Sequence, residues 1–151
     1  MFIRILITGG TFDKEYNEVS GQLTFAETHI PEMLKLGRST LPVHFQKIML
    51  EDSLNLSLAD RELIAKHCIE SPEELIIITH GTDTMVETAE IIAKKLDNNK
   101  TIVLTGALIP YRLGNTDGLF NLGAALAFVQ TQTPGVYIAM NGKCFNWNNV
   151  R

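Results

Sequence analysis

Residues Leu75–Ile92 read LIIITHGTDTMVETAEII and contain the change of pattern that decides the fold. The first four residues, Leu75–Ile78, are apolar and mostly β-branched, which predicts one buried strand. The next six residues, 79–84, are small or polar, and apolar side chains then recur at helical spacing between Met85 and Leu96. The stretch therefore predicts a strand, a tight polar turn and a helix.

The polar turn is expected to lie where ligands bind. In an open parallel sheet, the turn after a strand lies at the carboxyl end of the strands, which is the usual binding edge. Thr82 or Asp83 could instead serve only as a cap for the helix that follows. Capping accounts for one residue of the turn and leaves the rest of the polar cluster unexplained.

The same alternation of strand and helix runs along the whole chain. Its order predicts an α/β fold, with a three-layer, doubly wound parallel sheet of about five strands, flavodoxin-like or Rossmann-like, in a single domain over residues 1–151. Ser57 and Asp60 form a capping-box pattern at one helix start. The other predicted strands are 2–8, 43–50, 100–104 and 134–140, and the other predicted helices are about 30–37, 57–69 and 117–130.

Two segments show neither the helical nor the strand periodicity of apolar residues. Residues 9–24 are expected to form a long irregular connection, which in a compact α/β domain is usually functional and often a lid. Residues 141–151 are expected to form a polar tail after the last strand.

Composition limits the classes of function. The chain has 151 residues, a hydrophobic content of 45% and a net charge of −4, which together favour one globular domain and argue against nucleic-acid and anionic-membrane partners. No apolar run approaches a membrane span, and the start lacks a signal-peptide pattern, so a cytoplasmic protein is expected. Cys68 and Cys144 have neither metal-like spacing nor a disulfide-scaffold pattern.

Four predicted strand ends place polar residues on one rim of the sheet. Their glycines allow backbone to approach a ligand, their N–H groups can hold an anion or an oxyanion, and their hydroxyls are potential nucleophiles once activated. His80 lies in this cluster, but it and the other three histidines are expected to be packed or solvated, and neither a metal nor an organic cofactor is predicted. The four clusters are Thr8–Thr11, Asp52–Ser53, Thr79–Thr84 and Thr105–Ala107.

Two of these clusters match known motifs. TGGTFD at Thr8–Asp13 and HGTDTMVETA at His80–Ala89 resemble the two signature motifs of the bacterial-type L-asparaginases. The second motif is ten residues long and highly specific. The likeness covers nearly the whole chain in order, continuing through residues 16–21, 52–53, 105–107, 117–122 and 140–141.

The resemblance implies catalytic roles. Thr11 matches the family's threonine nucleophile, which attacks the side-chain amide carbon. Tyr16 matches the lid tyrosine that helps to activate that threonine. Thr82 matches a second essential threonine, which is linked to Asp83.

The resemblance also implies a substrate-binding set. Asp83 matches the contact to the substrate's α-amino group, and Ser53 matches the contact to its α-carboxylate. The backbone carbonyl of Ala107 matches the group that meets the leaving amide nitrogen, and Gly10 and Gly81 complete the set with a structural role of their own. A zwitterionic amino acid needs an anion site and a cation site beside the nucleophile, which this set provides.

Two departures from the family are expected. Family members commonly have a second, carboxyl-terminal domain that lends residues to a neighbouring subunit, and this chain is expected to be a short form without it. A family lysine that pairs with the motif aspartate lies in a V-T-K pattern, which aligns with Val150 and Arg151 and places the lysine after Arg151. Arg151 would be a poor replacement, because a permanently charged guanidinium cannot shuttle a proton.

The resemblance implies an amidohydrolase that converts L-asparagine to L-aspartate and ammonia, with a possible secondary glutaminase activity. The alternative is a non-catalytic module that binds asparagine or aspartate. The family implies a homodimer or homotetramer. The small residues of Gly123–Ala127 could pack against such a partner or equally against the chain's own sheet.

Overall fold

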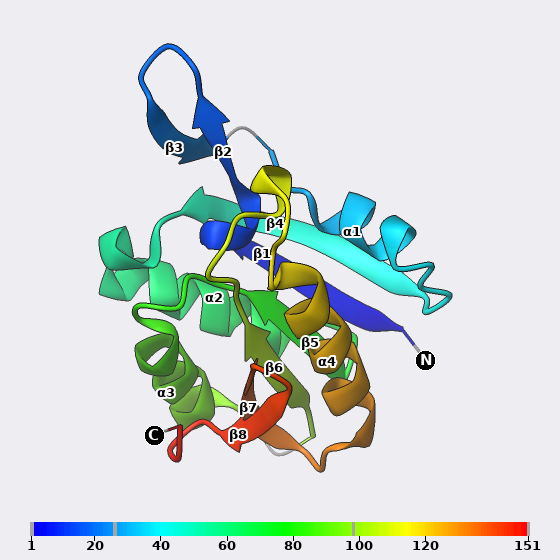
Figure 1. Ribbon diagram of the computed structural model, residues 1–151. Coiled ribbons are helices and arrows are strands. Elements are labelled where there is room, and N and C mark those ends of the chain that lie inside the picture. Colours follow the sequence, from blue (N-terminus) through cyan, green and yellow to red (C-terminus); the bar gives the residue numbers. More distant parts are fainter. Residues whose placement is uncertain (1, 26, 98, 151) are drawn as a thin grey trace.

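The apolar runs of the sequence form a six-stranded sheet in the computed structural model, which describes residues 2–25, 27–97 and 99–150 (Figure 1). The strand order is β4-β1-β5-β6-β7-β8, and every neighbouring pair is parallel except β7 and β8. This arrangement confirms the predicted parallel α/β sheet. The strands are β1 (Ile3–Gly9), β4 (Val43–Glu51), β5 (Leu75–Thr79), β6 (Thr101–Thr105), β7 (Gly135–Met140) and β8 (Lys143–Asn146).

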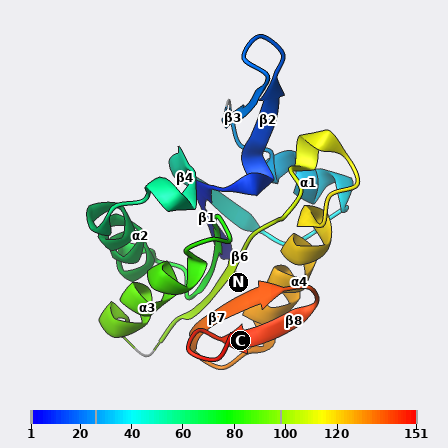
Figure 2. The ribbon, with the colours of Figure 1, turned by 60° about the vertical axis from the view of Figure 1, so that its left-hand side comes forward.

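Helices cover both faces of the sheet, which confirms the three-layer prediction (Figures 1 and 2). Side chains alternate between the two faces along each strand, so Ile77 packs with α1 and α4 while Ile76 and Ile78 pack with α2 and α3. Buried hydrophobic side chains form the centre of each cluster. The helices are α1 (Ile30–Leu36), α2 (Leu58–Glu70), α3 (Met85–Lys95) and α4 (Gly118–Thr131).

Helix α2 begins with the predicted capping box. The Asp60 N–H donates to the Ser57 hydroxyl at 3.1 Å, and the Ser57 N–H donates to the Asp60 carboxylate at 2.9 Å. Two N–H groups that the first helical turn leaves free are thereby satisfied.

The segment 9–24 contains regular structure that the sequence analysis did not predict. Strands β2 (Lys14–Asn17) and β3 (Gln22–Phe25) form an antiparallel hairpin that stands away from the main sheet (Figures 1 and 2). The Asn17 side chain accepts two N–H groups of the hairpin turn, and Gly21 supplies a positive φ of 70°. Its strands are short and largely exposed, so they lack the apolar alternation on which the prediction relied.

The predicted polar tail was also wrong at its start. Asn141 and Gly142 both have positive φ, 55° and 79°, and they turn the chain back into β8 beside β7. An Asn-Gly pair between two extended segments is a strong hairpin signal. Half-buried Cys144 and Phe145 lie on this strand. Arg151 lies outside the described residues.

The strand order creates a natural binding edge. From β1 the chain crosses to β4 on one side, whereas from β5 it crosses to β6 on the other, so the loops after β1 and β5 leave the sheet in opposite directions. Ligands of open α/β sheets bind at such a switch point, at the carboxyl ends of the strands.

Candidate active site

Close backbone packing joins the loops at the switch point. A Cβ on Gly10 would lie 2.5 Å from the Gly81 nitrogen, and one on Gly81 would lie 2.6 Å from the Ser53 hydroxyl. A Cβ on Gly106 would lie 2.6 Å from the His80 carbonyl oxygen and 3.0 Å from the Thr82 methyl group. No Cβ is tolerated at the shorter of these distances, so the glycines allow the four predicted clusters to meet on one rim.

Ser53 supplies an unpaired polar group to this rim. It begins the short 3-10 helix η2 (Ser53–Asn55), is only 1% exposed, and its hydroxyl has no hydrogen-bond partner among the described residues. Its carbonyl accepts a hydrogen bond from the Thr84 hydroxyl at 2.9 Å, which ties η2 to the turn after β5. A buried hydroxyl without a hydrogen-bond partner is unusual in a folded protein. It is available to form a hydrogen bond with a ligand.

Thr11 is half-buried at the start of the 3-10 helix η1 (Thr11–Asp13), and its neighbours anchor it. Phe12 is fully buried and packs against Gly118 at the start of α4, where a Cβ would come within 2.8 Å of the ring. The Asp13 carboxylate accepts the His29 N–H at 2.7 Å, and burial raises the pKa of Asp13. These contacts hold η1 against the sheet while Thr11 stays partly accessible.

The turn after β5 places Thr82 half-buried and Asp83 exposed, close to the loops after β4 and β6. Neither residue is the N-cap of α3. That position is Thr84, whose side chain makes no capping bond and instead reaches Ser53. The alternative in which Thr82 or Asp83 serves only as a helix cap therefore does not describe this turn.

His80 is fully buried and neutral. Burial lowers the pKa of His80 to about 4, and its ring nitrogens lie 2.7 Å from the Gly81 carbonyl and 2.8 Å from the Thr88 hydroxyl. The sequence predicts a packed or solvated histidine, and the structure places a packed one here. A neutral ring held by two partners orients the turn rather than transferring protons.

Ala107 is buried, and α4 holds the loop that carries it. The Asn121 side-chain amide donates to the Gly106 carbonyl at 2.8 Å and accepts the Asn141 N–H at 3.2 Å, which joins the ends of β6 and β7. The Asp117 carboxylate accepts the N–H groups that follow Ala107 in the chain, those of residues 108 and 109. Both side chains belong to the segment 117–122 that resembles the family, which implies no role for either of them. The sequence feature that could have indicated a role for Asn121 is a side-chain amide among the apolar positions of the predicted helix.

Tyr16 is the one predicted site residue that lies on the hairpin. It lies on β2, its side chain is 55% exposed, and the hairpin points away from the sheet (Figures 1 and 2). The base of this hairpin is held by Lys14, which pairs with Asp52 at 2.8 Å, and by Glu15, which pairs with Arg112 at 3.3 Å.

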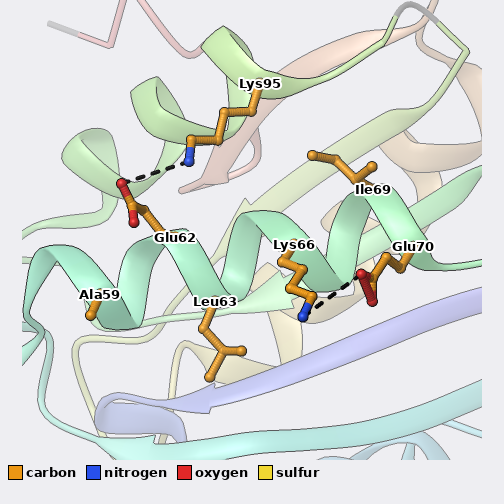
Figure 3. Close-up of a pocket in the computed structure, with 7 residues that line it drawn as sticks. All are labelled: Ala59, Glu62, Leu63, Lys66, Ile69, Glu70 and Lys95. Atoms are coloured by element: carbon orange, nitrogen blue, oxygen red, sulfur yellow. Dashed lines mark ion pairs between the residues drawn. The ribbon is translucent and has the colours of Figure 1, made fainter.

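A surface hollow lies away from this rim. It measures about 460 Å³, runs along the outer side of α2 next to α3, and contains none of the predicted site residues (Figure 3). Within the described ranges, no group of three or more His, Cys, Asp or Glu side chains is placed to hold a metal ion. In the same part of the chain, no helix is long and apolar enough to cross a membrane.

The fold is an open α/β sheet, and the rim lies at its switch point. Residues 2–151 match the family described as "Asparaginase, N-terminal", so the chain belongs to that family. This match confirms the resemblance found in the two sequence motifs.

Relatives and solved structures agree with this assignment. The L-asparaginase of Thermococcus kodakarensis is 29% identical over 95% of this chain and 45% of its own length. A component of the glutamyl-tRNA(Gln) amidotransferase of Methanococcus vannielii is 30% identical over 93% of this chain and 34% of its own length. The chain spans about half or less of the length of these relatives.

Two solved structures have the same fold. The thermostable L-asparaginase of Thermococcus kodakarensis has a TM-score of 0.85 at 28% identity, over 97% of this chain and 46% of that one. A probable cytoplasmic L-asparaginase of Campylobacter jejuni has a TM-score of 0.84 at 30% identity, over 97% of this chain and 48% of that one.

Proposed function

We propose that the chain is an amidohydrolase that converts L-asparagine to L-aspartate and ammonia in the cytoplasm, and that residues 1–151 form a catalytic domain of the asparaginase amino-terminal type. The single observation that carries the proposal is the buried, unpaired Ser53 hydroxyl beside Gly81, on the rim that also carries Thr11. A hydroxyl in this position suits a substrate carboxylate, which can only accept hydrogen bonds.

The proposed reaction follows from the chemistry of these groups. The Thr11 oxygen attacks the amide carbon and loses its proton, ammonia leaves with a proton, and water then cleaves the acyl bond to Thr11. Backbone N–H groups around Thr11 and Thr82 stabilise the oxyanion, and the Thr82–Asp83 pair assists proton transfer. Gly10 and Gly81 hold the loops of Thr11, Ser53 and Thr82 close together, and the Ala107 carbonyl receives the leaving amide nitrogen.

Tyr16 is 55% exposed on a hairpin that stands away from the main sheet. We propose that substrate brings this hairpin down over the rim. Lids of this kind close over the substrate and exclude water.

The test is ammonia release from L-asparagine by wild-type protein and by Thr11→Ala. The variant is expected to lose at least about 100-fold in kcat, because the nucleophile is gone. Thr40→Ala is the matched control, since Thr40 is an exposed residue between α1 and β4 and should keep the wild-type rate. Equal rates for wild type and Thr11→Ala would exclude the mechanism.

A second candidate is a binding module that holds asparagine or aspartate without turnover. The 55% exposure of Tyr16, on a hairpin that stands away from the main sheet, favours it, because a group that activates the nucleophile is expected to pack beside it. It predicts saturable aspartate binding in calorimetry, unchanged by Thr11→Ala, with no ammonia formed at high protein concentration.

The preference between amide substrates and the oligomeric state are further parts of the proposal. One methylene separates asparagine from glutamine and changes discrimination only modestly, so a secondary glutaminase activity is expected in an ammonia-release panel. We propose a homodimer or homotetramer, which light scattering at several protein concentrations would test.

A further inference from the structure

A chain of polar contacts links α2 to the turn after β5. The Arg61 guanidinium donates to the Thr88 hydroxyl at 2.6 Å and to the Thr84 carbonyl at 3.3 Å. Thr88 lies on α3 and is fully buried. Helices α2 and α3 lie side by side on one face, where Glu62 and Lys95 also pair across them at 3.6 Å (Figure 3).

The direction of each hydrogen bond in this chain follows from chemistry. The Gly81 carbonyl can only accept, so His80 Nδ1, at 2.7 Å, carries the ring hydrogen. The buried ring is neutral at pH 7, so its Nε2 accepts. The Thr88 hydroxyl, 2.8 Å from Nε2, therefore donates to His80 while its oxygen accepts from Arg61.

His80 in turn determines how the peptide between Gly81 and Thr82 is oriented. The described peptide bonds include no cis bond, and a trans peptide directs its C=O and its N–H in opposite directions. Because the Gly81 carbonyl points to the buried imidazole, the Thr82 N–H points away from it. Gly81 is also packed against Gly10 and Ser53, so the turn has little room for another orientation.

We propose that Arg61 is a positioning residue, which acts through Thr88 and His80 to direct the Thr82 N–H to the rim. A charged donor holds a hydroxyl more firmly than a neutral one, so removal of the guanidinium leaves the Thr88 hydroxyl free to rotate. His80 then loses its fixed tautomer, and the Gly81 carbonyl loses its hydrogen-bond donor. The effect on turnover rests on the proposed function, in which the Thr82 N–H stabilises the oxyanion, whereas the effect on the turn does not.

The first test is NMR of the ¹⁵N-labelled chain at pH 7. The wild-type protein should show His80 with hydrogen on Nδ1 only. Arg61→Met and Thr88→Val should each give a mixture of tautomers and a shifted Thr82 amide resonance, and Thr88→Ser should keep the wild-type pattern. Lys66→Met removes a cation from the exposed side of the same helix and should change neither signal. Hydrogen on Nε2 in the wild type, or an unchanged Thr82 amide in Arg61→Met, would overturn the proposal.

The second test is steady-state kinetics with L-asparagine. Arg61→Met should lower kcat about 10-fold per folded molecule and leave KM within about 2-fold, because an interaction made in the transition state is misplaced. A purely structural role would lower only the folded fraction, which far-ultraviolet circular dichroism measures, and would leave kcat per folded molecule unchanged. If the wild-type chain forms no ammonia, the proposed function fails, and the His80 and Thr82 resonances still decide whether Arg61 positions the turn.

Discussion

Gly10 and Gly81 lie against each other at the backbone, although 70 residues separate them in the chain. A Cβ on Gly10 would come within 2.5 Å of the Gly81 nitrogen and 2.7 Å of its Cα, and Gly10 has φ of 82°. The close approach of the loops after β1 and β5 therefore depends on glycine at this position, both for space and for backbone conformation.

Gly10→Ala should destabilise the fold and remove ligand binding. The expected loss in free energy of unfolding is about 3 kcal/mol, because the methyl group meets backbone at a strained φ. The matched control is Gly123→Ala, where nothing lies within 4 Å of the added Cβ in helix α4, so the free energy of unfolding should rise by about 0.5–1 kcal/mol. Urea unfolding measures the free energy of unfolding of both variants. Equal effects of the two substitutions would show that close packing at Gly10 does not require glycine.

Ser53→Ala should weaken substrate binding without weakening the fold. Its hydroxyl makes no hydrogen bond among the described residues, so its loss leaves the free energy of unfolding within about 0.5 kcal/mol of wild type. A charge-assisted bond to a carboxylate is worth about 1.5–3 kcal/mol, so the Kd for L-aspartate should rise about 10-fold or more. Calorimetry measures the Kd for L-aspartate, and urea unfolding measures the free energy of unfolding.

Ser57→Ala is the reciprocal control for Ser53→Ala. Ser57 closes the capping box of α2, so its loss should cost about 1 kcal/mol of stability and leave the Kd for L-aspartate unchanged. A Kd that responds to Ser57→Ala and not to Ser53→Ala would place the carboxylate site elsewhere.

Glu73→Gln should make stability less dependent on acid pH. The Arg4 guanidinium beside Glu73, at 2.7 Å, holds the pKa of that carboxyl well below its usual range. A lowered folded-state pKa contributes stability above the unfolded pKa of about 4.3, and this contribution is lost as pH falls toward the folded pKa. Wild type should therefore exceed the variant by about 2 kcal/mol at pH 7 and by less at pH 3.

Urea unfolding at the two pH values measures this difference for Glu73→Gln. Glu70→Gln is the control, because its exposed pair with Lys66, at 4.0 Å, should contribute less than about 0.5 kcal/mol. A gap between wild type and Glu73→Gln that stays constant from pH 7 to pH 3 would show that the ion pair is not its source.

Tyr16→Phe should lower kcat about 10–100-fold if the hairpin closes over the rim, since the phenol hydroxyl assists proton transfer. Closure should also slow amide hydrogen exchange of residues 14–25 when L-aspartate is bound. Val19→Ala, at the fully exposed hairpin tip, should change neither measurement. Unchanged exchange with saturating L-aspartate would show that the hairpin does not close on this ligand.

Much of the fold was predictable because the core strands and helices have strong local patterns. The runs at Leu75–Ile78 and Ile102–Leu104 are apolar and mostly β-branched, and each is followed by apolar side chains at helical spacing. The hairpin 14–25 and strand β8 were missed because each is short and lies at the margin of the fold, where a strand needs little apolar surface. The Asn141–Gly142 turn is the exception, since its residue types alone indicate a hairpin.

The candidate site was predictable in its residues and less so in its geometry. The motifs identified Thr11, Ser53 and Thr82, which the structure brings to one rim through close glycine packing. Their contacts with Arg61 and Asn121 were not predictable, because a side chain on one helix reaches a given turn only when the packing of neighbouring elements is known.

The sequence by itself determined where the parallel strands of the main sheet end and which residues follow them, because strand, turn and helix patterns depend on nearby residues. Only the tertiary structure decided that β1 lies next to β5, so that Gly10 meets Gly81, and that the hairpin with Tyr16 stands away from the main sheet. These relationships join segments far apart in the chain, and they arise from the order of the strands and the packing of side chains between layers.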